Sequence, residues 1–121
     1  MIFPCLHAFF VFRRSVNHQG GREMLKNFRL YRESVRFYQM CKPLAIGRDQ
    51  KDQLLRAASS IGRNISEGYG RIAPRDKRRF YRFALGSVRE CAAVFDQECV
   101  VDRDLRDVAD FLGGGLYKLG R

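Results

Sequence analysis

A stripe of apolar residues at helical spacing is the feature that most constrains the fold of this chain. The stripe consists of Leu54, Ala58, Ile61 and Ile65. Spacings of four, three and four residues place these side chains on one face of a helix. The small residues beside it, which would let a second helix approach closely, are Ala57, Ser59, Ser60 and Gly62. Gly68 and Gly70 follow, and glycine takes the left-handed conformation at a helix C-terminus without a Cβ clash. The segment predicts a closely packed helix that ends at about Glu67.

Other segments with apolar periodicity predict helices before and after this one. A first helix from about 27 to 41 has an apolar face formed by Phe28, Tyr31, Val35 and Tyr38. Pro43 and Gly47 mark the next turn, and Asp49 or Asp52 can cap the helix that carries the stripe. Pro74 suits the first turn of a third helix that ends near 99 or 100. The apolar stripe of this third helix is Phe80, Ala84, Ser87, Cys91 and Phe95.

A fourth helix completes the predicted fold. It begins at Asp102 or Asp104, and its apolar face is Leu105, Val108, Leu112, Leu116 and Leu119. Three glycines at 113–115 interrupt it, and each costs about 1 kcal/mol relative to alanine, so we expect the last turn to fray or bend. No segment has the period of two residues that marks a strand. Four helices joined by short loops predict an all-α fold, a single antiparallel up-down-up-down four-helix bundle.

Small residues predict a close contact between the second and third helices. They are Ala57, Ala58, Gly62, Ala84, Gly86 and Ser87. A larger side chain in such a contact overpacks it, so we expect Gly86→Leu to cost about 1–3 kcal/mol or more.

The first 23 residues are interpreted as a leader that precedes the folded domain at 24–121. Residues 1–12 are apolar and Arg13 and Arg14 follow them, which reverses the order of a secretory signal. The apolar run is also too short to span a bilayer. Codons for Gln19-Gly20-Gly21 can contain a Shine–Dalgarno sequence two codons before Met24, so we expect translation to begin at Met24. The competing interpretation is an amphipathic tail that touches a membrane.

The histidines and cysteines argue against an enzyme or a metal centre. His7 and His18 precede Met24, so a protein that begins there lacks the commonest general base and zinc ligand. The cysteines are Cys5, Cys41, Cys91 and Cys99. No Cys-x-x-Cys pair and no secretion signal accompany them, which favours reduced thiols in the cytoplasm. Cys91 and Cys99 lie two helical turns apart and should pack as small apolar residues. We expect no catalytic residue, no metal and no cofactor.

The strongest charge cluster follows the second helix and enters the third. It consists of Arg71, Arg75, Lys77, Arg78, Arg79 and Arg82. Only Asp76 opposes these charges, in a chain whose formal net charge is +10. Tyr69, Tyr81 and Phe83 interleave with them, and arginine beside exposed aromatic rings is typical of surfaces that bind RNA phosphates and unstacked bases. The alternative is a solvated face whose arginines pair with acidic residues of the same or a neighbouring subunit.

Two segments carry a resemblance to a known family. Residues 55–71 read Leu-Arg-Ala-Ala-Ser-Ser-Ile-Gly-Arg-Asn-Ile-Ser-Glu-Gly-Tyr-Gly-Arg, and residues 84–87 read Ala-Leu-Gly-Ser. They resemble the four-helix-bundle family encoded in intervening sequences of bacterial 23S ribosomal RNA genes. The signature positions, interpreted as structural, are Arg56, Ala58, Ser60, Ile61, Asn64, Ile65, Glu67, Gly68, Gly70, Gly86 and Ser87. The resemblance implies a homo-oligomer, a pentameric ring of bundles, with no catalytic role for Glu67. We interpret Asn64 and Glu67 as a hydrogen-bonded clamp on the loop at 68–70.

Two functions therefore remain open. The first is a non-enzymatic oligomer that associates with RNA or another nucleic acid through the basic cluster. The second is a protein-interaction scaffold whose charged and aromatic surface serves self-assembly. Salt distinguishes them, because counterion release makes nucleic-acid affinity fall steeply with salt, whereas apolar contacts persist.

Overall fold

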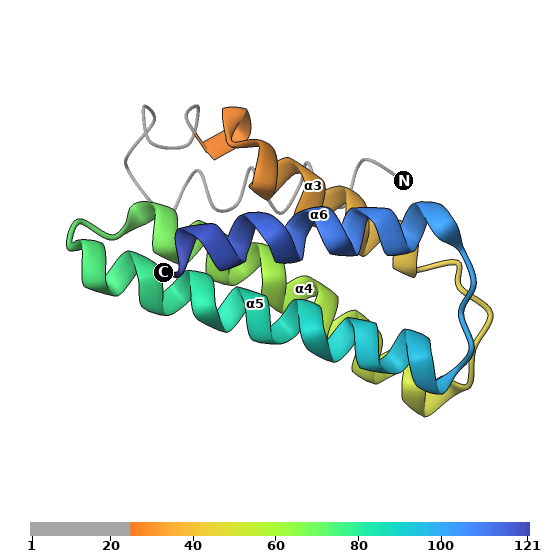
Figure 1. Cartoon of the computed structure of the whole chain (residues 1–121). Helices are drawn as coiled ribbons and strands as arrows, with labels where there is room; N and C mark the ends of the chain where they lie inside the picture. Colours follow the sequence, from red (N-terminus) through yellow and green to blue (C-terminus); the bar gives the residue numbers. More distant parts are fainter. Residues whose placement is uncertain (1–24) are drawn as a thin grey trace.

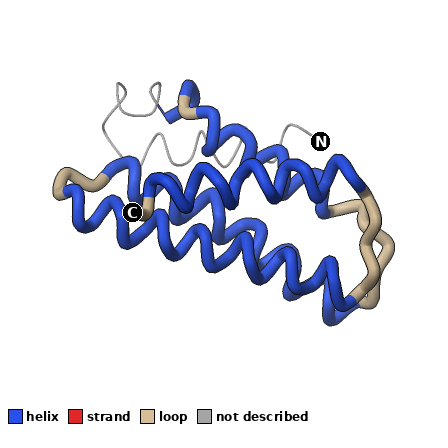
Figure 2. Tube along the Cα trace, in the orientation of Figure 1, coloured by secondary structure: helices blue, strands red, loops and turns tan. Residues whose placement is uncertain are grey.

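The chain is helical throughout the part that the structure describes. The computed structural model describes residues 25–121. Its helices are α3 (Arg29–Cys41), α4 (Arg48–Gly70), α5 (Pro74–Gln97) and α6 (Arg103–Leu119) (Figure 1). A helical turn at 25–27 precedes α3, and no strand occurs among the described residues (Figure 2). The predicted all-α fold class is therefore confirmed, while the leader predicted for 1–23 lies outside the described residues.

The four helices pack in a closed cycle. α4 lies against α3 and α5, and α6 lies against the same two helices. In Figure 1 the α4–α5 connection lies at one end of the molecule, and the α3–α4 and α5–α6 connections lie together at the other. We call these the α4–α5 end and the α5–α6 end. The chain terminus that follows α6 returns to the α4–α5 end, where Arg82 contacts Gly120.

The core contains the apolar stripes predicted for α4 and α6. The α4 residues Leu54, Ala58, Ile61 and Ile65 are at most 1% exposed. On α6, Leu105, Val108, Leu112 and Leu116 are buried, whereas Leu119 in the last turn is largely exposed. Phe37 of α3 and Phe95 of α5 meet edge to face, with ring centroids 6.0 Å apart. Burial of each large apolar side chain stabilises the fold by about 1.5–3 kcal/mol.

The buried face of α3 differs from the predicted one. The residues that face the core are Leu30, Ser34, Phe37 and Cys41, whereas Tyr31, Val35 and Tyr38 are only half-buried. Both sets have helical spacing, and the core set is inconspicuous in the sequence because it contains a serine. The Ser34 hydroxyl donates to the Tyr31 carbonyl at 2.6 Å, so this polar group is satisfied inside the core.

The prediction that Gly68 and Gly70 take the left-handed conformation is wrong. α4 continues to Gly70, and no glycine among the described residues has a positive φ. Gly68 instead permits the close contact between α4 and α5. A Cβ at this position would lie 2.9 Å from Cε1 of Tyr81 and 3.2 Å from Cβ of Phe80. The glycine is there because the facing helix leaves no room for a side chain.

The predicted small-residue contact between α4 and α5 is only partly present. Its alanines, Ala57, Ala58 and Ala84, are buried. Gly62 faces α3, because a Cβ there would lie 3.0 Å from Oγ of Ser34. Gly86 is exposed, and a Cβ there would meet no atom within 4 Å. The overpacking predicted for Gly86→Leu is therefore wrong, since position 86 lies off the face that α5 presents to the core.

The glycines at 113–115 do not interrupt the last helix. α6 runs continuously from Arg103 to Leu119. A Cβ at Gly115 would lie 2.8 Å from Cδ2 of Leu30, so this glycine lets α6 approach α3. Packing of an apolar face stabilises a helix more than intrinsic propensity does, which explains why the expected fraying does not occur.

The predicted cap of α6 is confirmed, whereas the predicted caps of α4 and the shared packing of two cysteines are wrong. Asp102 caps α6 by accepting a hydrogen bond from the Leu105 N–H at 3.0 Å, as predicted. Gly47, without a side-chain cap, precedes α4 in place of Asp49 or Asp52. Cys91 is buried, but Cys99 is exposed with a φ of 54° in the turn after α5. It does not share the packed face of Cys91, because α5 ends at Gln97.

Candidate nucleic-acid interface

The predicted basic cluster lies at the α4–α5 end. Arg71, in the loop, and Arg75, Arg79 and Arg82, on α5, are exposed, whereas Lys77 and Arg78 are half-buried. The loop between Gly70 and Pro74 is short, so the fold brings all six cationic side chains to one end of the bundle.

Two of the six cations bind backbone carbonyls of the protein itself. Lys77 Nζ donates to the carbonyl of Tyr69 at 2.9 Å and to that of Gly68 at 3.4 Å. These carbonyls belong to the last turn of α4, where a positive charge is stabilised by the helix dipole. Arg82 Nε donates to the Gly120 carbonyl at 2.7 Å and so connects α5 to the chain terminus. Lys77 and Arg82 therefore hold the α4–α5 end together.

Two further arginines stack on phenylalanine rings. The guanidinium of Arg71 lies 4.7 Å from the centroid of Phe80. That of Arg79 lies 6.0 Å from Phe80 and 5.4 Å from Phe83. The two rings meet edge to face with centroids 5.8 Å apart. We call Arg71, Arg79, Phe80 and Phe83 the Arg–Phe cluster. Cation–π contacts leave most guanidinium N–H donors available for another partner.

The remaining two cations have no partner of their own. Among residues 25–121, Arg75 and Arg78 form no hydrogen bond, ion pair or ring contact. They lie in the first turns of α5, which begins at Pro74. The positive end of the helix dipole makes this an unfavourable place for cations and a favourable one for an anion. Asp76 is the acidic residue of this first turn.

Sequence reasoning missed two arginines that belong to the same surface. Arg89 is exposed and lies seven residues, or two turns, beyond Arg82 on α5. Helical periodicity extended past the cluster would have found it. Arg121 follows Gly120 and lies over the ring of Tyr117, 5.8 Å from its centroid. No sequence signal places Arg121 here, because its position depends on the hydrogen bond between Arg82 and Gly120.

The polar signature residues of α4 form local bonds. Asn64 Nδ2 donates to the carbonyl and to Oγ of Ser60, both at 3.0 Å. Ser87 Oγ donates to Ser60 Oγ at 3.0 Å, which extends this network from α4 to α5. Glu67 forms an ion pair with Arg71 at 2.9 Å. The predicted clamp on a loop at 68–70 is wrong, because these residues form the last turn of α4; Glu67 pairs with Arg71 just beyond the helix, and Asn64 bonds within its own helix. Arg56 is exposed, and its side chain has no partner among the described residues.

A groove of about 640 Å³ lies between α3 and α4. The α3 side is lined by Tyr31, Ser34, Val35 and Tyr38. The α4 side includes Gly62, Arg63, Asn64 and Glu67. The face that the sequence predicted to be the core of α3 thus lines this groove.

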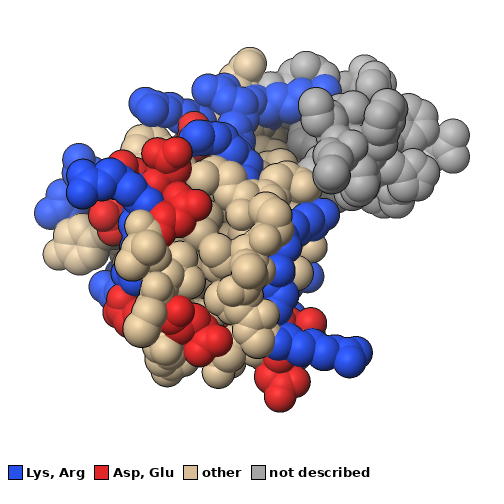
Figure 3. Space-filling view, turned by 90° about the vertical axis from the view of Figure 1, so that its right-hand side faces the viewer, with Lys and Arg blue, Asp and Glu red and all other residues tan. Residues whose placement is uncertain are grey.

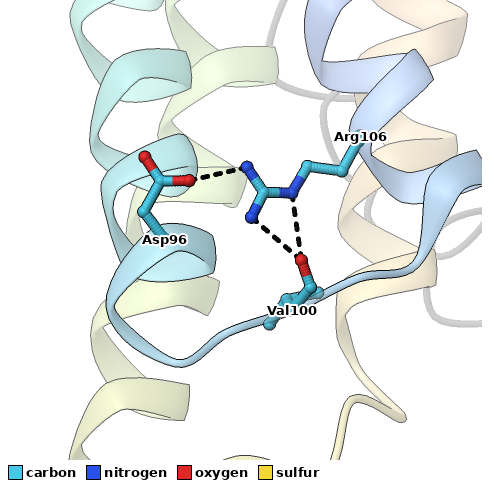
Figure 4. A network of polar contacts seen from close by, with 3 residues as sticks. All are labelled: Asp96, Val100 and Arg106. Carbon is cyan, nitrogen blue, oxygen red and sulfur yellow. Dashed lines mark hydrogen bonds and ion pairs between the residues drawn. The ribbon is translucent and has the colours of Figure 1, made fainter.

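The opposite end of the bundle uses its charges differently. Arg106 of α6 donates to Asp96 Oδ1 at 2.7 Å and twice to the Val100 carbonyl, at 2.9 and 3.1 Å (Figure 4). Its guanidinium also lies 5.5 Å from the ring of Phe95. Figure 3 looks onto the α5–α6 end and shows side chains of both signs around an uncharged centre. Here the arginine closes the turn between two helices.

Metal-ligating side chains and buried thiols are two kinds of reactive group that a protein can use. Residues 25–121 contain no group of three His, Cys, Asp or Glu side chains that could hold a metal ion. Burial raises the pKa of the Cys41 thiol to about 12 and raises that of Cys91 further. Such thiols stay protonated at neutral pH and are poor nucleophiles. Among the described helices, none is both long and apolar enough to cross a membrane.

These observations define an all-α protein with a basic surface at one end of its helices. A family model described as 23S rRNA-intervening sequence protein matches residues 26–104, and the chain belongs to this family. The match confirms the family suggested by the signature and covers α3, α4, α5 and the start of α6. The comparisons with curated proteins and with solved structures gave no match.

Proposed function

We propose that the protein is a non-enzymatic, oligomeric four-helix-bundle protein that binds RNA or another nucleic acid through its α4–α5 end. One observation carries the proposal. Arg75, Arg78 and Arg79 form no ion pair within residues 25–121, although they lie together in the first turns of α5. The family, named for an intervening sequence of 23S rRNA, supports a role connected with RNA.

Phosphate groups would resolve the unfavourable electrostatics of this end. Cations at a helix N-terminus repel the positive end of the helix dipole and each other. A phosphate is attracted by both the backbone N–H groups and the guanidinium groups. Arginine suits this role because its planar donors bind phosphate oxygens in pairs. The partner class we propose is therefore a polyanion with phosphates along a backbone.

Self-assembly is part of the proposal. The resemblance to the family implies a homopentameric ring of bundles, and we propose that each bundle is antiparallel up-down-up-down and that the ring acts in the cytoplasm. Tyr117 is 56% exposed, and Tyr31 and Tyr38 line the open groove between α3 and α4. Phe37, the other large aromatic residue of this part of α3, is fully buried and contributes nothing to such a contact. A ring would present several basic ends to one nucleic acid and so raise the effective affinity.

The test removes the three unpaired charges together. Arg75→Gln, Arg78→Gln and Arg79→Gln in one variant should weaken binding to RNA fragments of any sequence. Each lost phosphate contact should lower the slope of log affinity against log salt by about 0.7–0.9. Folding stability should change by no more than about 1 kcal/mol per site, since none of the three side chains forms an ion pair or a hydrogen bond within residues 25–121 and the ring contacts of Arg79 are exposed. Filter-binding titrations at several salt concentrations measure the slope, and thermal unfolding measures stability.

A matched control separates position from net charge. The variant Arg48→Gln, Arg56→Gln and Arg103→Gln removes three exposed arginines that also lack partners among the described residues. It should retain most of the salt slope. Sedimentation equilibrium of both variants tests the competing function, a protein-interaction scaffold whose charged and aromatic surface serves self-assembly. Unchanged RNA binding together with a dissociated oligomer in the first variant would reject the nucleic-acid function and favour the scaffold.

A further inference from the structure

An exposed phenylalanine lies beside an exposed glycine on α5. Phe83 is 46% exposed, which is unusual for a large apolar ring in the middle of a helix. Gly86 lies three residues further along the same helix. A Cβ at Gly86 would meet no atom within 4 Å, so the space above this position is open. Glycine is the poorest helix former apart from proline, and no contact within residues 25–121 requires it here.

The two positions are neighbours because of the direction of helical side chains. Side chains on a helix lean toward its N-terminus and cover the preceding turn. A side chain at position 86 would therefore lean toward Phe83. Because residue 86 is a glycine, it has no side chain that could cover the exposed ring of Phe83. The neighbours of this ring are the guanidinium of Arg79, 5.4 Å from its centroid, and the ring of Phe80, which meets it edge to face.

The geometry points to a stacking site for one unpaired base. We propose that the surface formed by Phe83 and Gly86 receives a base of single-stranded RNA, while Arg75, Arg78 and Arg79 contact the flanking phosphates. This inference rests on the proposed function and narrows it from nucleic acid in general to single strands. Stacking on an aromatic ring is the usual way in which proteins hold single-stranded bases without reading their sequence.

A duplex cannot use this surface in the same way. The bases of an A-form helix are stacked on each other and present only their edges and the backbone. The free arginines can still contact the phosphates of a duplex, so both forms should bind. The single strand should gain the stacking contact in addition. Arg79 lies four residues before Phe83, and its guanidinium is 5.4 Å from the centroid of the ring, so a phosphate next to a stacked base would meet a cation.

The experiment compares two probes on variants that alter the ring or its open side. The probes are a 12-nucleotide oligouridine and a blunt RNA duplex of the same length. Phe83→Leu keeps an apolar side chain but removes the aromatic face. Gly86→Leu fills the open space beside the ring. Each should lower the affinity for oligouridine by about tenfold and leave the affinity for the duplex unchanged.

Gly114→Leu is the matched control for Gly86→Leu. Gly114 is also exposed within a helix, and a Cβ there would likewise meet no atom within 4 Å. This substitution should leave both affinities unchanged. All three variants should fold, because the substitutions lie at exposed positions. Circular dichroism checks this.

The outcomes separate this inference from the proposed function. Equal binding of both probes by the unchanged protein, with no effect of Phe83→Leu, would overturn the stacking site while leaving the nucleic-acid function intact. Salt-independent or absent binding of both probes would overturn both. A loss of oligomer mass in Gly86→Leu, with oligouridine affinity unchanged, would assign this surface to contacts between copies of the chain and also overturn the inference.

Discussion

Arg106 at one end of the bundle and Arg75 and Arg78 at the other have opposite roles. At the α5–α6 end, Arg106 binds a carboxylate, a backbone carbonyl twice and the face of a ring. At the α4–α5 end, Arg75 and Arg78 bind nothing within residues 25–121. The first arginine contributes to folding, and the others are available to a partner. Abundance of arginine alone therefore does not identify a binding surface; the partners of each side chain do.

The difference follows from the chemistry of the two turns. The turn after α5 contains Cys99 with a positive φ. The Val100 carbonyl in this turn accepts no hydrogen bond from a backbone N–H of the described residues. An arginine from the next helix supplies donors to that carbonyl. The turn after α4 is closed by Lys77 and by the pair of Glu67 with Arg71. The other cations of this end are thus not needed to close it.

Arg106→Ala should produce the largest effect on stability. It removes both donors from the Val100 carbonyl, in addition to the ion pair with Asp96. An acceptor left without donors costs about 1–3 kcal/mol, and the exposed ion pair adds no more than about 1 kcal/mol. We expect a loss of about 2–3 kcal/mol, measured by urea unfolding.

Two controls show where that loss comes from. Asp96→Asn removes the ion pair alone and should cost less than about 1 kcal/mol. Arg79→Ala at the other end should change stability by no more than about 1 kcal/mol, the worth of an exposed cation–π contact. Equal losses for Arg106→Ala and Arg79→Ala would contradict the proposed difference between the two ends, because both arginines would then contribute equally to folding stability.

Gly68→Ala should have the next largest effect and destabilise the α4–α5 end. The added Cβ would lie within 3.2 Å of both Tyr81 and Phe80, so the two helices would have to separate. Overpacking of this kind costs about 1–3 kcal/mol, of which the better helix propensity of alanine returns up to about 1 kcal/mol. Gly70→Ala is the control, since a Cβ there meets no atom within 4 Å. Thermal unfolding should show a lower Tm for Gly68→Ala only; equal Tm values would mean that α4 and α5 are not held this closely.

The apolar periodicity of the sequence was sufficient to locate α4, α5 and α6. The stripe predicted for α5 is only partly correct, because Phe80 and Ser87 are half-buried and the core takes Tyr81, Val88 and Val94 instead. The periodicity misplaced the buried face of α3, because Ser34 satisfies its own hydroxyl and can replace an apolar residue in the core. The glycines were misinterpreted for a related reason. Sequence alone does not distinguish a glycine required by a facing helix, such as Gly68 or Gly115, from one that faces open space, such as Gly86.

The sequence predicted that six cations form the candidate interface. It did not predict which of them bind the protein itself and which have no partner. Charge density is a local property of the sequence, so the cluster itself could be found. Its division depends on partners that are distant in sequence. Arg82 binds a carbonyl 38 residues away, and no local pattern indicates this. The contact of Arg79 with Phe83 joins residues four apart on one helix and could have been inferred from spacing.

Gly86→Ala is the prediction with the smallest effect, and it has the opposite sign from the others. The added methyl group meets no neighbouring atom, so no packing cost arises. Alanine loses less backbone entropy than glycine in a helix interior, which should stabilise the protein by about 1 kcal/mol and raise Tm by about 4–8 °C. Gly114→Ala, in similarly open surroundings on α6, should give a comparable gain in the same calorimetric measurement. A destabilised Gly86→Ala alongside a stabilised Gly114→Ala would show that position 86 is covered in solution, by another copy of the chain. Equal gains would show that the surface beside Phe83 is open in the protein without its partner. The glycine at position 86 would then lower the stability of the helix although no packing contact requires it.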